Sequence, residues 1–180
     1  MRLFTALCCA LLISGCAGSG SDVEGPVTAG KVDLERYQGT WYEQARLPMF
    51  FQRKCVRSEA NYRLQDDGSV AVTNRCETRD GEWQQAEGEA VPQQAGETDK
   101  LWVQFDNWFS TLFPGLTKGH YWILYLADNY SAVLVGSPNR DYLWLLSRSE
   151  DIDATTRDRL LEEARKRGYD TGALIWRGES

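Results

Sequence analysis

The residues of this chain that could carry out chemistry are five cysteines and a single histidine, His120. With one histidine we can assemble no Ser-His-Asp, Cys-His or multi-histidine zinc arrangement. Neither a G-x-S-x-G nor a C-x-x-C pattern is present. We therefore expect no enzyme activity, no catalytic residue, no metal and no cofactor. A single axial haem ligand is a possible role for His120, and a hydrogen-bonded histidine near the start of a strand is the simpler interpretation.

Cys16 ends an apolar stretch that has the features of an export signal. Arg2 precedes an uncharged run over residues 3–13, which is too short to span a bilayer. The run LISGC at residues 12–16 resembles the lipobox of bacterial lipoproteins. That resemblance implies cleavage just before Cys16 and a lipid anchor on its thiol. An ordinary cleaved signal, with Cys16 as a passive thiol, is the alternative.

We therefore divide the chain into a signal peptide over residues 1–15, a lipidated flexible tether over residues 16–31, and one domain over residues 32–180. Ala17, rather than an acidic residue, follows the cysteine, which resembles the sorting choice for the bacterial outer membrane. We expect an anchored domain that faces the periplasm, with the outer membrane as a partner. The chain has 20 basic and 26 acidic side chains, a net charge of −6, so a nucleic-acid partner is not expected.

Cys55 and Cys76 are the cysteines that remain in the exported body if residues 1–15 are removed and Cys16 is acylated. Two thiols in an oxidising compartment favour one disulfide. They flank a hairpin pattern, with runs at residues 59–64 and 70–75, so pairing could bring them within bridging distance. Two reduced, buried cysteines are the alternative.

Short runs of alternating apolar and polar residues, separated by turn residues, indicate an all-β domain. We expect strands near residues 40–47, 58–64, 70–76, 83–91, 100–105, 120–126, 131–136 and 142–148. Eight strands are typical of an antiparallel up-and-down β-barrel that holds one small ligand. A helical period at about residues 154–167 then predicts one helix packed outside the barrel, with Gly168 at its C-cap. A short final strand is expected at residues 173–176.

Three local motifs, in the right order, resemble those of the lipocalin family. Gly39 and Trp41 belong to a G-x-W motif at the start of the first strand. Asp128 and Tyr130 resemble the second motif, in a turn, and Arg148 matches the third, an arginine at a strand end. The sequence is most similar to the bacterial outer-membrane lipoprotein type within this family, which is related to apolipoprotein D. The resemblance implies structural roles for these residues at the closed end of the barrel, with the Arg148 guanidinium over the Trp41 indole.

Ligand-binding residues are expected on the inner face of the barrel. If Trp41 points inward, alternation along each strand selects the inner positions, and an error of one residue inverts a strand's whole set. These positions are Glu43, Ala45, Tyr62, Val72, Gly88, Ala90, Leu101, Val103, Phe105, Tyr121, Ile123, Tyr125, Ala132 and Leu134. Their apolar wall suits an elongated acyl chain better than a polar metabolite. A barrel filled by its own side chains is the alternative.

Two apolar loops are expected at the open mouth of the barrel. They contain Phe50 and Phe51 in the first loop, and Trp108, Phe109 and Phe113 in the connection over residues 106–119. Exposed apolar loops of this size mark contacts with lipid, membrane or protein, and a lid folded into the barrel is the other possibility.

These features together predict an outer-membrane-anchored lipocalin that binds a fatty acid or lysophospholipid for lipid storage, transport or membrane maintenance. The alternative is a non-enzymatic envelope module that docks a protein partner through the apolar loop at residues 108–116. A homodimer formed through the same loop is also possible.

Overall fold

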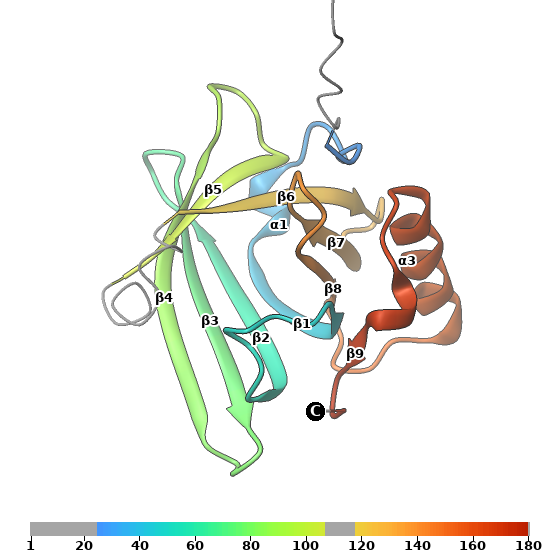
Figure 1. Cartoon of the computed structure of the whole chain (residues 1–180). Coiled ribbons are helices and arrows are strands. Elements are labelled where there is room, and N and C mark those ends of the chain that lie inside the picture. Colours follow the sequence, from blue (N-terminus) through green and yellow to red (C-terminus); the bar gives the residue numbers. More distant parts are fainter. Residues whose placement is uncertain (1–24, 107–117, 180) are drawn as a thin grey trace, which may run out of the picture.

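The computed structural model describes residues 25–106 and 118–179. These residues form strands β1 (Gly39–Arg46), β2 (Cys55–Leu64), β3 (Val70–Thr78), β4 (Trp83–Pro92), β5 (Lys100–Phe105), β6 (Gly119–Leu126), β7 (Ala132–Gly136), β8 (Leu143–Ser147) and β9 (Ile175–Trp176). They also form helices α1 (Leu34–Tyr37) and α3 (Ala154–Lys166) and the 3-10 helix η1 (Thr171–Ala173). Figure 1 shows α3 beside the strands.

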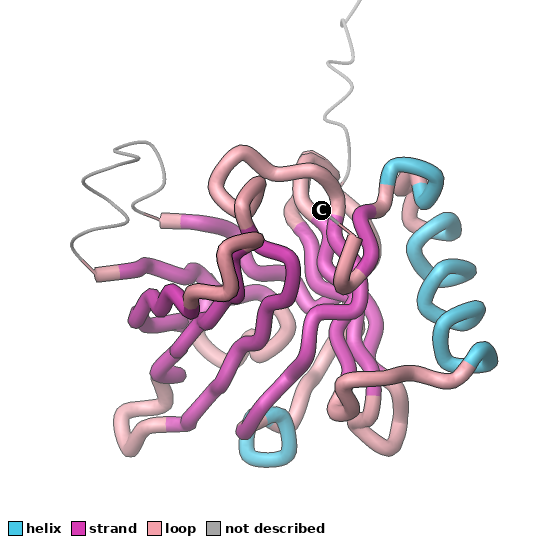
Figure 2. Tube along the Cα trace, turned by 90° about the horizontal axis from the view of Figure 1, so that it is seen from below, coloured by secondary structure: helices cyan, strands magenta, loops and turns pink. Residues whose placement is uncertain are grey.

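Strands β2 to β8 follow one another around a barrel, each antiparallel to the next. Strand β1 closes the ring because it pairs with both β8 and β2. The short β9 pairs with the end of β1, where Ala45 lies opposite Trp176. Figure 2 shows the ring of strands with α3 along its outside. The predicted fold, an eight-stranded antiparallel up-and-down barrel with one outer helix and a short final strand, is confirmed.

The burial of side chains explains why most strands show an alternating sequence. In β2, Ala60 and Tyr62 are buried, whereas Asn61 and Arg63 between and beside them are exposed. Strand β7 differs because all five of its residues are buried. Its outer face is covered by α3, so both faces of this strand need apolar side chains.

Helix α3 begins and ends where its capping residues predict. Asp153 is the N-cap, and its Oδ1 accepts a hydrogen bond of 2.8 Å from the Thr156 amide. Gly168 follows the last turn with φ +83°, a conformation that glycine adopts without strain. Leu160 and Ala164 are fully buried against the barrel.

The buried apolar residues form two separate clusters. The first fills the barrel interior and contains Val32, Tyr37, Trp41, Ala60, Tyr62, Val70, Val72, Ala90, Leu101, Ile123, Val133, Val135 and Leu146. The second lies between the barrel wall and α3 and contains Ala45, Leu124, Ala132, Leu134, Leu143, Leu145, Leu160, Ala164, Tyr169 and Leu174. Because these clusters lie between Val32 and Leu174, a chain that begins at Ala17 contains the complete fold.

The segment before α1 departs from the predicted flexible tether. The Ala29 amide donates to the Ile123 carbonyl at 2.8 Å, and the Val27 carbonyl accepts from Arg167 Nε at 3.0 Å. Residues 27 and 29 of the predicted tether are therefore bound to the end of α3 and to the barrel. Helix α1, which follows this segment, was not predicted, although Asp33 caps it by accepting from the amides of Glu35 and Arg36.

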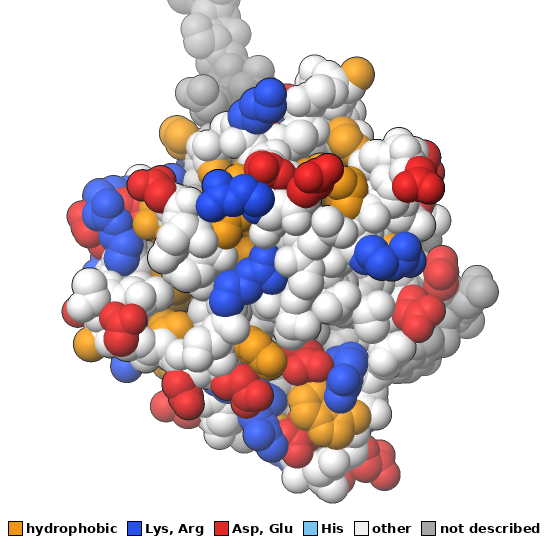
Figure 3. Space-filling model, turned by 180° about the vertical axis from the view of Figure 1, so that it is seen from behind, with side chains coloured by type: hydrophobic (Ala, Val, Ile, Leu, Met, Phe, Trp, Pro, Cys, Tyr) orange, Lys and Arg blue, Asp and Glu red, His pale blue; other side chains and the backbone are white. Residues whose placement is uncertain are grey.

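Charged side chains of both signs are interspersed over the surface. On the face shown in Figure 3, acidic and basic groups alternate, with apolar side chains in small patches between them. Many of these charges are paired, such as Arg57 with Glu77 and Arg75 with Glu59. Such exposed pairs contribute at most about 1 kcal/mol each to stability.

Candidate functional site

The interior of the barrel next to α1 is the candidate binding pocket. Leu34 and Tyr37 of α1 cover its base, and its walls come from β2 to β6. The lining residues on these strands are Tyr62, Val70, Val72, Ala90, Leu101, Val103 and Tyr121. The free volume of this pocket is about 10 Å³, which is close to the volume that a single water molecule needs. The described residues therefore leave a narrow pocket that is nearly filled.

Most of the positions predicted to face inward do so. Tyr62, Val72, Ala90, Leu101, Val103, Phe105, Tyr121 and Ile123 all belong to the interior cluster or pack against it. Gly88 lies between Val72 of β3 and Phe105 of β5. A Cβ atom on Gly88 would lie 2.3 Å from the Gln104 carbonyl oxygen, so a larger residue would force the two strands apart.

Four predicted ligand-binding positions are wrong in orientation. Ala45, Tyr125, Ala132 and Leu134 belong to the cluster under α3 or pack against it, outside the barrel. Register shifts interrupt β1 between Glu43 and Ala45, and β6 between Ile123 and Tyr125. Each shift inserts a residue and inverts the alternation beyond it. In β7 the inward residues are instead Val133 and Val135.

Three tyrosine hydroxyls meet inside this apolar pocket. The Tyr121 hydroxyl donates to the Tyr62 oxygen at 3.0 Å and lies 2.8 Å from the Tyr37 oxygen. Burial raises the pKa of Tyr62 to about 12 and raises the pKa values of Tyr37 and Tyr121 well above their usual range. All three phenols are therefore neutral at physiological pH. They provide the polar contact of an otherwise apolar pocket.

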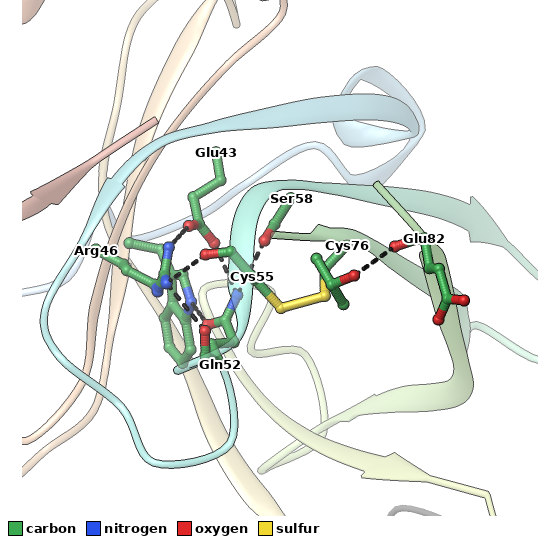
Figure 4. Close-up of a disulfide and its surroundings, with 9 residues drawn as sticks. Glu43, Arg46, Gln52, Cys55, Ser58, Cys76 and Glu82 are labelled. Carbon is green, nitrogen blue, oxygen red and sulfur yellow. Dashed lines mark hydrogen bonds and ion pairs between the residues drawn. A yellow bond between two sulfur atoms is a disulfide. The ribbon is translucent and has the colours of Figure 1, made fainter. Parts of the chain in front are cut away.

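A second group of polar side chains lies where β1 ends, near the disulfide (Figure 4). Glu43 and Arg46 are buried and form an ion pair of 2.7 Å. The other Glu43 carboxylate oxygen accepts from Gln52 Nε2 at 2.9 Å. The Trp144 indole donates to Gln52 Oε1 at 2.8 Å. Glu43 was predicted to bind ligand, but both of its carboxylate oxygens already have partners within the protein.

Arg46 also holds the loop that connects β1 to β2. Its Nη2 donates to the carbonyl oxygens of Gln52 and Cys55, at 3.0 and 2.9 Å. Because β1 starts beside α1 and runs away from it, this loop lies at the end of the barrel that we call the mouth.

The predicted disulfide between Cys55 and Cys76 is present, and its Cα atoms are 5.5 Å apart. It joins the mouth ends of β2 and β3 (Figure 4). Replacement of both cysteines with serine is expected to lower the free energy of unfolding by about 3 kcal/mol, because it frees a loop of 21 residues in the unfolded chain. Urea denaturation of the oxidised protein and the double variant measures the difference.

Reduced wild-type protein is the control for that comparison, and it should unfold at the same urea concentration as the double variant. A loss of less than about 1 kcal/mol would mean that the neighbouring strands alone hold the two ends together.

The lipocalin-like motif residues gather at the α1 end, as predicted. The Arg148 guanidinium carbon lies 3.9 Å from the centre of the Trp41 ring. Tyr130 has φ +60°, and its hydroxyl accepts from the Asp33 amide at 3.0 Å. Gly39 has φ +91°, and a Cβ atom there would lie 3.3 Å from Arg148 Nη1. The neighbouring Asp128 contributes its carbonyl oxygen, which accepts from Arg36 Nη2 at 3.2 Å. These contacts hold α1 in place at the closed end of the barrel, where it covers the base of the pocket.

The mouth loops are only partly described. Phe50 is 50% exposed, and its ring lies 5.3 Å from that of Phe51. Phe51 also contacts the ring of Tyr142 at 5.6 Å. Trp108, Phe109 and Phe113, like the proposed anchor Cys16, lie outside the described residues.

His120 lies on the barrel wall and has partners of its own. Its Nδ1 is 3.0 Å from Gln93 Nε2, and its ring packs at 4.2 Å from that of Trp102. Partial burial lowers its pKa. The interpretation as a hydrogen-bonded histidine is confirmed. In the described part of the chain, no group of three or more His, Cys, Asp or Glu residues is placed to hold a metal ion.

Comparisons with known proteins agree with this geometry. Residues 32–179 match the family model of the lipocalin-like domain. The chain is 36% identical over 178 residues to the outer membrane lipoprotein Blc of Vibrio cholerae, covering 98% of each chain. It is 35% identical to Blc of Escherichia coli K12, covering 98% of this chain and 95% of the relative.

More distant proteins share the fold. Apolipoprotein D of Bos taurus is 33% identical over 138 residues, covering 73% of this chain and 68% of the relative. Among solved structures, insecticyanin from the tobacco hornworm Manduca sexta aligns with a TM-score of 0.66 at 19% identity. That alignment covers 87% of this chain and 85% of insecticyanin.

Proposed function

The chain belongs to the lipocalin family, and we propose that it binds a lipid amphiphile, a fatty acid or a lysophospholipid, inside its barrel. The observation that carries this proposal is the pocket itself. Its lining is apolar except for the hydroxyls of Tyr37, Tyr62 and Tyr121. An acyl chain matches such a wall, whereas a polar metabolite would leave its own groups without partners.

The narrow pocket sets a physical condition on binding. Pockets for ligands of this size have volumes of roughly 300–1,000 Å³, whereas only about 10 Å³ is free inside this barrel. Side chains that line the pocket must therefore move apart when an acyl chain enters. Val103 lies at the edge of the pocket and is only partly buried, so it is well placed to meet the entering chain.

We further propose that the protein is a lipoprotein of the outer membrane, anchored by acylated Cys16 and facing the periplasm. The lipobox-like residues before Cys16 and the names of the Vibrio cholerae and Escherichia coli relatives support this location. Among the described residues, no helix is long and apolar enough to cross a membrane. An anchored lipid-binding barrel would store or transfer lipid, or maintain the membrane.

The direct experiment is a titration of residues 17–180 with lysophospholipids and fatty acids. Tryptophan fluorescence follows binding, and native mass spectrometry gives the stoichiometry. Saturable binding of one lipid per chain is the expected result. A folded, ligand-free domain that binds none of these lipids would overturn the proposal and favour the alternative of a protein-docking module.

Val103→Trp is expected to weaken lipid binding by about tenfold or more, because the larger ring fills the pocket without removing any buried polar contact. The matched control is Gln104→Trp, at the next and exposed position of β5, which should bind lipid like the parent. Circular dichroism checks that both variants fold. Equal affinity of folded Val103→Trp and the parent would place the ligand elsewhere.

A further inference from the structure

A larger groove lies outside the barrel interior, on the flank of the mouth. It has a volume of about 600 Å³ and is lined by the β1–β2 loop, the β3–β4 hairpin and the C-terminal segment. Met49 and Phe50 come from the first of these, Arg79 from the second, and Leu174 and Glu179 from the third. It shares no lining residue with the pocket inside the barrel.

Strand pairing and the disulfide bring these three segments together. Cys55 lies opposite Thr78 in the β2–β3 register. Arg53, just before β2, and Arg79, just after β3, therefore lie near each other at this end of the barrel. The Cys55–Cys76 bridge closes the same two strand ends. The Gly178 amide donates to the Val56 carbonyl at 2.9 Å, which holds the C-terminal segment against β2.

Two arginines without an ion pair meet in this groove. Arg53 and Arg79 are exposed, and among the described residues neither has an ion-pair partner. A third arginine in the lining, Arg46, is buried and already paired with Glu43. Glu179 is the acidic residue of the lining. Two unpaired guanidinium groups in a chain of net charge −6 favour an anionic occupant.

We propose that this groove binds the phosphate head group of an anionic membrane lipid, held by Arg53 and Arg79. A guanidinium donates two parallel hydrogen bonds to phosphate oxygens, a geometry that ammonium groups do not match. The apolar side chains of Met49, Phe50 and Leu174 line the same groove and can contact the acyl chains next to the head group. Half of the Phe50 surface is exposed, which suits insertion at a membrane interface.

This site would orient the mouth of the barrel toward the bilayer. A tethered domain whose mouth meets the membrane can exchange a lipid without releasing it into water. The groove is independent of the proposed ligand pocket, so either can fail without the other.

The test is a vesicle flotation assay with residues 17–180. One set of vesicles is pure phosphatidylcholine, and the other contains about 30% phosphatidylglycerol, which makes the surface strongly anionic. The fraction of parent protein that floats with the anionic vesicles should be at least about tenfold larger than the fraction that floats with pure phosphatidylcholine. Arg53→Glu/Arg79→Glu should lose this preference. The control variant Lys31→Glu/Arg63→Glu makes the same change in net charge at exposed positions outside the groove. It should keep the preference for anionic vesicles.

Three further measurements separate the possible explanations. Inorganic phosphate at millimolar concentration should not displace the protein from anionic vesicles, and full displacement would show a free-anion site without lipid contact. Val103→Trp should float like the parent, because the barrel interior is not involved. If both charge-reversed variants lose flotation equally, net charge alone explains the preference for anionic vesicles, and the proposal is overturned.

Discussion

Arg46→Met is expected to lower the free energy of unfolding by about 3–5 kcal/mol, the largest effect of any single substitution considered for this barrel. Arg46 is 2% exposed and Glu43 is 5% exposed, so neither charge is solvated by bulk water. Removal of the guanidinium leaves the Glu43 carboxylate buried without a counter-charge. It also removes the donor to the carbonyl oxygens of Gln52 and Cys55. Urea denaturation at pH 7 measures the loss.

The double variant Glu43→Leu/Arg46→Met shows whether the cost comes from the uncompensated charge. It should recover most of the lost stability, because a buried ion pair contributes little more than a well-packed apolar pair. The hydrogen bond from Trp144 to Gln52 remains in this variant. A double variant as unstable as Arg46→Met would instead assign the cost to the lost loop contacts. A single-variant loss below about 1 kcal/mol would mean that water reaches the pair.

The same ion pair shows what alternation alone cannot predict. Glu43 and Arg46 are three positions apart in one strand, so regular alternation places them on opposite faces. The register shift between Glu43 and Ala45 puts both side chains in one buried cluster. The same shift moves Ala45 to the outside of the barrel. Nothing in the composition of these residues marks the irregularity, because it depends on how β1 pairs with β8.

Strand β7 shows a second limit of sequence reasoning. All residues from Ala132 to Gly136 are buried, since the interior lies on one side and α3 on the other. An unbroken apolar run of this kind carries no information about which residues face inward. In β2 to β5, where one face meets solvent, the inner residues such as Tyr62 and Leu101 were predicted correctly.

The residues of the candidate site that lie on strands could be predicted from the sequence, whereas the residue from α1 could not. Tyr62 and Tyr121 follow from alternation, but their hydrogen-bonded partner Tyr37 belongs to α1, a helix of four residues. So short a helix has no hydrophobic period. The one available signal was Asp33, whose position before Glu35 and Arg36 is typical of an N-cap.

Arg148→Ala is expected to lower the free energy of unfolding by about 3 kcal/mol, because one side chain here makes several contacts that no neighbour replaces. Its Nη1 donates to the Thr40 carbonyl at 2.9 Å, and its Nη2 donates to the carbonyls of Tyr37 and Arg36 at 3.0 and 3.1 Å. It also lies over the Trp41 ring. Arg148 is partly buried, which lowers its pKa, and this partial desolvation strengthens the contact of the charge with the indole.

Two comparison variants make this prediction specific. Arg148→Lys keeps the charge, but one ammonium group cannot reach all of these carbonyls while it covers the ring, so it should lose about half as much stability. Arg36→Ala removes an exposed guanidinium that lies over the ring of Tyr130 and donates one exposed hydrogen bond to the Asp128 carbonyl, and it should cost less than about 1 kcal/mol. Hydrogen exchange at residues 34–37 should rise in Arg148→Ala, because α1 loses its attachment to the barrel. If Arg148→Ala costs no more than Arg36→Ala, the closed end of this barrel is held by apolar packing rather than by the arginine.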